Sequence, residues 1–254
     1  MADRGNDAPV LRFLSLATLL LAWQIGAMAA GPRQLPPPLA VVQALLREAQ
    51  SGALFSSLGI TLLRVVLAFS IAMLLGTALG IAMGRNRKFD AIADPWIVAL
   101  LNLPALVIIV LAYIWAGLTE AAAIGAVALN KLPNAAVTLR EGARALDPHL
   151  DDMAKVFGMS RWTRFRHVLV PQLGPYIAAA ARSGLSLVWK IVLVVELLGR
   201  PDGVGFEIGT AFQLFDVTLI LAYALAFVVV MLAIETFVVQ PLERYASRWR
   251  PKPT

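Results

Sequence analysis

The chain has 254 residues, of which 59% are hydrophobic and 15% are charged, and its mean hydropathy is +0.75. Soluble domains average about 45–50% apolar and about 25% charged residues, and the absence of cysteine removes disulfides, thiolate metal sites and cysteine nucleophiles, so an ordinary soluble or redox enzyme is excluded. The 22 Lys and Arg residues, which give a net charge of +6, are dispersed among apolar segments, as in membrane-protein loops rather than in a nucleic-acid-binding surface.

Six apolar segments approach the length of about 20 residues that a helix needs to cross a bilayer core of about 30 Å. They are Val10 to Ala30, Ser57 to Gly84, Trp96 to Ala116, Ala121 to Leu139, Gly174 to Leu198 and Val217 to Val239. The sequence therefore predicts an all-α polytopic membrane protein with about six transmembrane helices and a single permease-like domain over residues 1–254. The first segment has an alternative interpretation as a secretory signal, because Ala27-Met28-Ala29 resembles a cleavage site.

The distribution of cationic residues predicts the orientation of these segments. With the N-terminus inside, the outer loops hold only Arg33, Arg47 and Arg200, whereas the inner loops and tails hold most of the others. The positive-inside rule therefore places both termini in the cytoplasm. On the outer side, Leu39 to Glu48 has apolar residues at helical spacing and is expected to form a short surface helix.

Small residues and prolines predict how the spans pack. The second span carries a glycine at every fourth position: Gly76, Gly80 and Gly84. This spacing lets two helix backbones approach closely in lipid. Pro104 and Pro133 lie inside the third and fourth spans, where a proline frees a carbonyl group and kinks the helix unless neighbours repair it.

The stretch from Glu141 to Pro171 is too polar to cross a membrane, yet it has a helical pattern. We expect one short helix over Leu150 to Phe157, a left-handed stop at Gly158, and a second helix capped by Ser160. Pro171 is expected to break the chain before the fifth span. The stretch also carries large apolar side chains: Met153, Val156, Phe157, Met159, Trp162 and Phe165. They need a partner surface, pack against the inner ends of the spans, or serve as aromatic anchors at the headgroups.

The same stretch resembles the EAA loop of binding-protein-dependent ATP-binding-cassette permeases, whose pattern is E-A-A-x3-G-x9-I-x-L-P. Here it reads D-M-A-K-V-F-G from Asp152 to Gly158 and, after nine residues, V-L-V-P ending at Pro171. It departs from the pattern at Asp152, Met153, Val168 and Val170. Further segments resemble the nitrate, sulfonate and taurine branch of these permeases: Leu35 to Pro38, Thr61 to Arg64, the glycine repeat, Gly117, Glu196 and Gly203 to Phe206.

This resemblance implies a coupling helix over Asp152 to Phe165 that docks into a groove on a cytosolic nucleotide-binding subunit. The residues expected to serve this coupling are Asp152, Met153, Ala154, Phe157, Gly158, Met159, Ser160, Trp162, Phe165 and Pro171. The resemblance also implies a second copy of the permease, two nucleotide-binding subunits, and a periplasmic or lipid-anchored substrate-binding protein. The sequence lacks a G-x-x-x-x-G-K-[ST] phosphate loop, so we expect ATP and Mg on the partner subunit and neither enzyme activity, cofactor nor metal on this chain.

Ionisable residues inside the predicted spans are candidates for a solute pathway, because a charge in lipid must face protein, water or a counter-charge. The candidate pathway residues are Lys131, Asn134, Ser186 and Lys190. The two lysines favour an anionic solute. Internal ion pairing is the alternative for the other charges, with Arg64 paired to Glu196 and Arg182 paired to Glu235.

Together these features predict the permease subunit of an importer in a bacterial inner membrane, which moves a small anionic solute such as a sulfonate, nitrate or an organic acid. An ion-coupled secondary transporter is the alternative, because it would also carry ionisable residues within its spans. A membrane-embedded enzyme is disfavoured, because no His, Asp and Glu cluster has the spacing of an intramembrane catalytic site.

Overall fold

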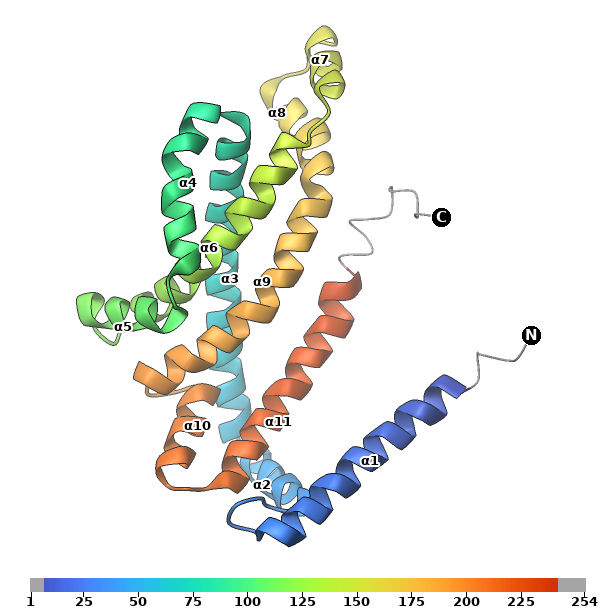
Figure 1. Ribbon diagram of the computed structural model, residues 1–254, viewed down its shortest axis with the longest axis vertical. Coiled ribbons are helices and arrows are strands. Elements are labelled where there is room, and N and C mark those ends of the chain that lie inside the picture. Colours follow the sequence, from blue (N-terminus) through green and yellow to red (C-terminus); the bar gives the residue numbers. More distant parts are fainter. Residues whose placement is uncertain (1–6, 242–254) are drawn as a thin grey trace.

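The computed structural model describes residues 7–241, and every regular element within them is helical (Figure 1). The helices of the first half are α1 (Asp7–Ala30), α2 (Pro38–Ser51), α3 (Ala53–Arg85), α4 (Arg87–Asn102), α5 (Ala105–Ala116) and α6 (Glu120–Arg144). Those of the second half are α7 (Pro148–Val156), α8 (Arg161–Arg164), the π-helix η1 (Phe165–Leu169), α9 (Val170–Gly199), α10 (Val204–Gln213), α11 (Val217–Ile234) and the π-helix η2 (Glu235–Val239).

Close packing of α3 on α6 forms the centre of the bundle. An added Cβ at Gly76 would lie 2.6 Å from Cβ of Ala135, and one at Gly84 would lie 2.6 Å from Cβ of Ala143. The missing side chains therefore let the two backbones approach closely, as the glycine repeat predicts.

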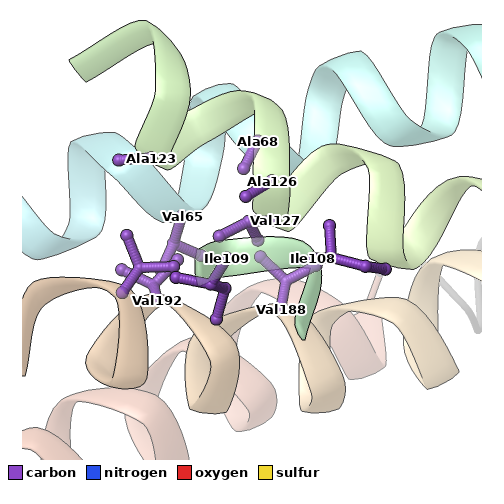
Figure 2. Close-up of a cluster of buried hydrophobic side chains, with 10 residues drawn as sticks. Val65, Ala68, Ile108, Ile109, Ala123, Ala126, Val127, Val188 and Val192 are labelled. Carbon is purple, nitrogen blue, oxygen red and sulfur yellow. The ribbon is translucent and has the colours of Figure 1, made fainter. Parts of the chain in front are cut away.

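The largest apolar cluster lies where α3, α5, α6 and α9 meet (Figure 2). Its buried members are Val65, Ala68, Ile108, Ile109, Ala123, Ala126, Val127, Val188, Val192 and Val195. Most are small or β-branched, and such side chains allow the close van der Waals packing that holds helices together in lipid.

The predicted third span, Trp96 to Ala116, is not one helix. It divides into α4 and α5, which meet at an angle of 99° at Leu103 and Pro104. Pro104 has no N–H to continue α4, and Leu103 takes the extended conformation that precedes a proline. The expected kink is therefore a complete break. By contrast, α6 continues through Pro133 without interruption.

The all-α membrane fold is confirmed, although fewer helices reach spanning length and hydropathy than the sequence predicts. In the described part of the chain these are α3, Arg161–Gly199 and Val217–Val239, with the bent pair of α4 and α5 as a further broken span. In α1 only the shorter stretch Leu14–Ala30 is comparably apolar. Central α6, which packs against α3, α5 and α9, carries the polar residues Asn130, Lys131 and Asn134. Lys131 is buried, and the two asparagines are half-buried.

The connecting helices gather at opposite ends of the molecule. At one end lie α7 and α8, and at the other α2 and α10 (Figure 1). The predicted short helix after the first segment is confirmed as α2, whose Val41 and Ala44 are buried. Helix α1 extends away from the other helices (Figure 1) and is joined to the start of α2 by Trp23, whose indole N–H donates to the carbonyl of Pro36 at 3.0 Å.

Candidate functional site

The loop between α6 and α9 forms two helical arms separated by a tight turn. Asp147 caps α7 by accepting a hydrogen bond from the N–H of His149 at 2.8 Å. At the other end, Gly158 has φ +62°, the N–H of Met159 donates to the carbonyl of Ala154, and the N–H of Gly158 donates to that of Lys155, each at 3.0 Å. This pairing is a Schellman motif, so the left-handed stop predicted at Gly158 is confirmed.

The second arm starts at the predicted cap and then departs from prediction. The hydroxyl of Ser160 accepts a hydrogen bond from the N–H of Thr163 at 3.1 Å, which confirms the cap. The predicted break at Pro171 is wrong, because α8, η1 and α9 form one continuous helix over Arg161–Gly199. In η1 the N–H of Val170 bonds to the carbonyl of Phe165, and this wider turn accommodates the proline ring that follows.

The residues expected to serve coupling divide into an exposed set and a supporting set. Phe157 is 74% exposed and Trp162 is 66% exposed, and the neighbouring Val156, which the resemblance does not single out, is 85% exposed. Asp152, Met153, Gly158, Ser160, Phe165 and Pro171 are also exposed, whereas Ala154 is buried and Met159 is half-buried. The rings of Trp162 and Phe165 stack with their centroids 5.7 Å apart. The two arms thus present exposed apolar side chains. They lie at one end of the molecule (Figure 1).

Asp152 carries a negative charge on the surface of α7. Nζ of Lys155 donates to its Oδ1 at 2.8 Å, one helical turn away. This hydrogen bond lowers the pKa of Asp152 from its usual range, so the residue is a carboxylate at neutral pH. The mild departure from Glu in the EAA pattern therefore keeps the charge.

Two of the predicted pathway residues, the lysines, do not face a common cavity within this chain. Lys131 is 1% exposed and packs against Gly184 of α9. A Cβ added at Gly184 would lie only 2.5 Å from Cε of Lys131. Within residues 7–241 its Nζ has no hydrogen-bond partner. Lys190 is exposed, with Nζ 5.6 Å from the ring centroid of Trp189.

The other two pathway residues lie apart as well. Asn134 is half-buried on α6, where its carbonyl accepts the hydroxyl of Thr138 at 2.9 Å. Ser186 lines a cavity of about 600 Å³ between α9 and α11, together with Arg182 and Glu235. Nε of Arg182 lies 3.8 Å from Oε1 of Glu235, so the second predicted ion pair is confirmed at long range.

The first predicted ion pair, between Arg64 and Glu196, is confirmed and belongs to a larger polar cluster. Nη1 of Arg64 lies 2.8 Å from Oε1 of Glu196, and both side chains are buried. Arg64 also pairs with Glu120 at 2.5 Å and with the carboxylate of Asp202. Sequence reasoning misses these two carboxylates, because they lie at element ends and are 56 and 138 residues from Arg64.

This polar cluster around Arg64 fixes the turn between α9 and α10. Oε2 of Glu196 accepts hydrogen bonds from the hydroxyl of Thr61 at 2.9 Å and from the N–H of Gly205 at 2.8 Å. Gly203 has φ +99°, and an added Cβ there would lie 2.5 Å from the Glu196 carboxyl carbon. The glycines of the Gly203 to Phe206 segment thus allow the backbone to close over a buried carboxylate.

A bundle of long apolar helices with a two-armed polar loop and buried charges is the architecture of a polytopic membrane protein. The family described as binding-protein-dependent transport system inner membrane component matches residues 72–250. The chain belongs to this family, and it is a permease subunit of an ATP-binding-cassette transporter.

Several relatives are similar along most of their length. The protein named "Putative aliphatic sulfonates transport permease protein SsuC" of Escherichia coli (strain K12) is 31% identical over 92% of this chain and 89% of its own. The taurine transport system permease protein TauC of the same strain is 28% identical over 92% and 88%. The bicarbonate transport system permease protein CmpB of Synechococcus elongatus is 27% identical over 82% and 78%.

Solved structures show the same fold. An amino acid ABC transporter, crystallised with histidines, has a chain with a TM-score of 0.63 and 22% identity, over 79% of this chain and 97% of that one. A chain of the MetNI methionine ABC transporter in an inward-facing conformation has a TM-score of 0.61 and 17% identity, over 73% and 92%.

Proposed function

We propose that the chain is half of a homodimeric permease that imports a small anionic solute, such as a sulfonate, across a bacterial inner membrane. Two cytosolic nucleotide-binding subunits bind ATP and Mg, and a periplasmic or lipid-anchored protein delivers the solute. Both termini are cytoplasmic. The similar proteins for sulfonates and bicarbonate support an anionic solute, and taurine, although a zwitterion, also carries a sulfonate group.

The observation that carries this proposal is the exposed apolar surface on α7 and α8. Val156, Phe157 and Trp162 are each at least two-thirds exposed although they lie on a polar loop, where no lipid tails cover them. The Schellman turn at Gly158 joins the two arms rigidly, and the second arm continues into α9 without a break. When a subunit bound to this surface moves, the movement is therefore transmitted to α9.

Replacing Phe157 by aspartate tests the docking surface. Since this ring is 74% exposed, the substitution F157D should leave the permease folded but place a charge in the interface. The tagged permease is purified from its native host in mild detergent, and the ATPase subunit that co-purifies with it is quantified. We expect F157D to reduce the amount of this subunit by at least about tenfold.

Phe215 offers a matched control, because it is 85% exposed and lies in the turn between α10 and α11. Helix α10 is at the opposite end of the molecule from α7 and α8 (Figure 1). F215D should retain the ATPase subunit at the wild-type level. Retention by F157D at that same level would contradict the docking role. If the wild-type permease carries no ATPase subunit and takes up solute without ATP, an ion-coupled transporter replaces the proposed function.

The pathway role of the two lysines is tested by K131M and K190Q. Methionine fills the space of the buried Lys131 side chain without its charge, and Lys190 is exposed enough to accept glutamine. We expect each change to reduce uptake of labelled taurine or sulfonate in proteoliposomes by about tenfold, because a favourable charge on the anion's path is lost. K88Q removes an exposed lysine at the start of α4 and should leave uptake unchanged. Unchanged uptake and ATPase rates in both test variants would refute the pathway role.

A further inference from the structure

A cavity of about 620 Å³ opens at the end of the molecule where α7 and α8 lie (Figure 1). It is enclosed by the last residues of α3 and α6, the start of α7, and the helix running from α8 through η1 into α9. Four arginines line it: Arg85, Arg144, Arg161 and Arg164. Of the residues expected to serve coupling, Phe165 lines it, whereas none of the four predicted pathway residues does.

The charges around the cavity leave an excess of positive charge. Its single carboxylate, on Asp147, is engaged in capping α7. Arg144 is neutralised by Asp90 at 2.5 Å and Glu141 at 3.0 Å, on the side of α4 and α6. In the part of the chain that the structure describes, Arg85 and Arg161 make neither an ion pair nor a side-chain hydrogen bond. These two guanidinium groups remain available to an anion.

The remaining lining is apolar, which indicates the kind of anion that fits. Ala143, Leu146, Phe165, Val168 and Leu169 form this part of the wall. A small soluble anion gains nothing from such a surface, whereas an amphiphile places its phosphate at the arginines and its glycerol and first methylenes against the apolar wall.

An aromatic pair lies beside the cavity. Trp162 stacks on Phe165, which itself lines the cavity. Basic pockets between transmembrane helices on the cytoplasmic side are the sites where anionic headgroups bind.

We propose that this cavity binds the headgroup of an anionic phospholipid, with Arg85 and Arg161 contacting its phosphate. The bound lipid bridges the end of α3, the end of α6 and both arms of the coupling loop, and so stiffens the loop against the bundle. Binding itself requires neither ATP nor a transported solute, so its test is independent of the proposed function.

The test is native mass spectrometry of the full-length permease, together with any subunits that co-purify. The protein is incubated with dioleoylphosphatidylglycerol, with dioleoylphosphatidylcholine, or with inorganic phosphate. The wild type should retain the anionic lipid, and R85Q/R161Q should reduce that retention by about tenfold or more, toward the level of the zwitterionic lipid. R87Q/R166Q is the matched control, because it removes the same charge from nearby exposed arginines that do not line the cavity.

Three outcomes would overturn the proposal. Equal loss in both double variants would mean that general surface charge, not the cavity, attracts the lipid. Displacement of the lipid by inorganic phosphate at equal concentration would identify a site for a soluble anion. Lipid retention that vanishes when the ATPase subunit is present would assign the cavity to an acidic segment of that subunit. Equal melting temperatures of the lipid-free proteins verify folding, and the single variants R85Q and R161Q replace the double variant if it unfolds.

Discussion

Replacing Gly80 by alanine is expected to destabilise the permease by about 1–3 kcal/mol or more, because it forces α3 away from α6. The added Cβ would lie 2.9 Å from Cβ of Leu139 and 3.0 Å from the backbone N of Arg140, and closer still to the carbonyl oxygen of Ala136. Backbone atoms inside a helix cannot rotate away as a side chain can, so the whole contact must open. Leucine at this position should abolish folded protein.

Gly59 is the matched control for this experiment, since it lies in the same helix and an added Cβ would meet no atom within 4 Å. G59A should be neutral or stabilising by up to about 1 kcal/mol, because alanine is the better helix former. Thermal unfolding of both variants in detergent, read by the loss of monodisperse protein, distinguishes them. If G80A unfolds at the same temperature as G59A, α3 and α6 are not held in this close contact.

Removing the guanidinium of Arg64 is expected to cost about 3–5 kcal/mol, because it leaves the buried carboxylate of Glu196 without its cation. The variant R64Q also loses the contacts with Glu120 and with the turn at Asp202. The C-terminal end of α9 and the start of α10 should therefore become less stable. Thermal unfolding measures the stability loss, and protection of the α10 amides from hydrogen exchange locates it.

Two further variants separate this buried pair from an ordinary ion pair. The double variant R64Q/E196Q should be less destabilised than R64Q, because no unpaired charge is left behind. E235Q removes a carboxylate from the pair with Arg182, which is partly exposed and 3.8 Å long, and should cost only about 0–1 kcal/mol. If R64Q loses no more stability than E235Q, the polar cluster around Arg64 does not hold the turn between α9 and α10.

Local sequence patterns predict the features that depend on neighbouring residues. The stop at Gly158 follows from a glycine after an amphipathic run, and the cap at Ser160 follows from a hydroxyl before a helical pattern. The close approach of two helices follows from the glycine repeat, although the repeat alone does not name α6 as the partner. Where a feature depends on the surrounding turn geometry, as at Pro171, the residue type predicts the wrong result.

The placement of the buried charges depends on contacts between distant segments. The sequence indicates that Lys131 needs protein or water around it, but only the packing of α6 on Gly184 decides that it is enclosed within the protomer. The pairing of Arg64 with Glu196 can be predicted from their positions along the spans. Glu120 and Asp202 join this pair only because the start of α6 and the turn before α10 lie next to each other.

The sequence by itself determined the fold class, the transport family and the two arms of the loop between α6 and α9, because hydropathy, helix-stop chemistry and a spaced loop pattern are local properties. Only the tertiary structure decided that the third span breaks at Pro104, that Arg64 has three carboxylate partners, and that four arginines surround one cavity. The physical reason is that the angle between helices and the meeting of helix ends result from packing over the whole bundle, which no short stretch of sequence encodes.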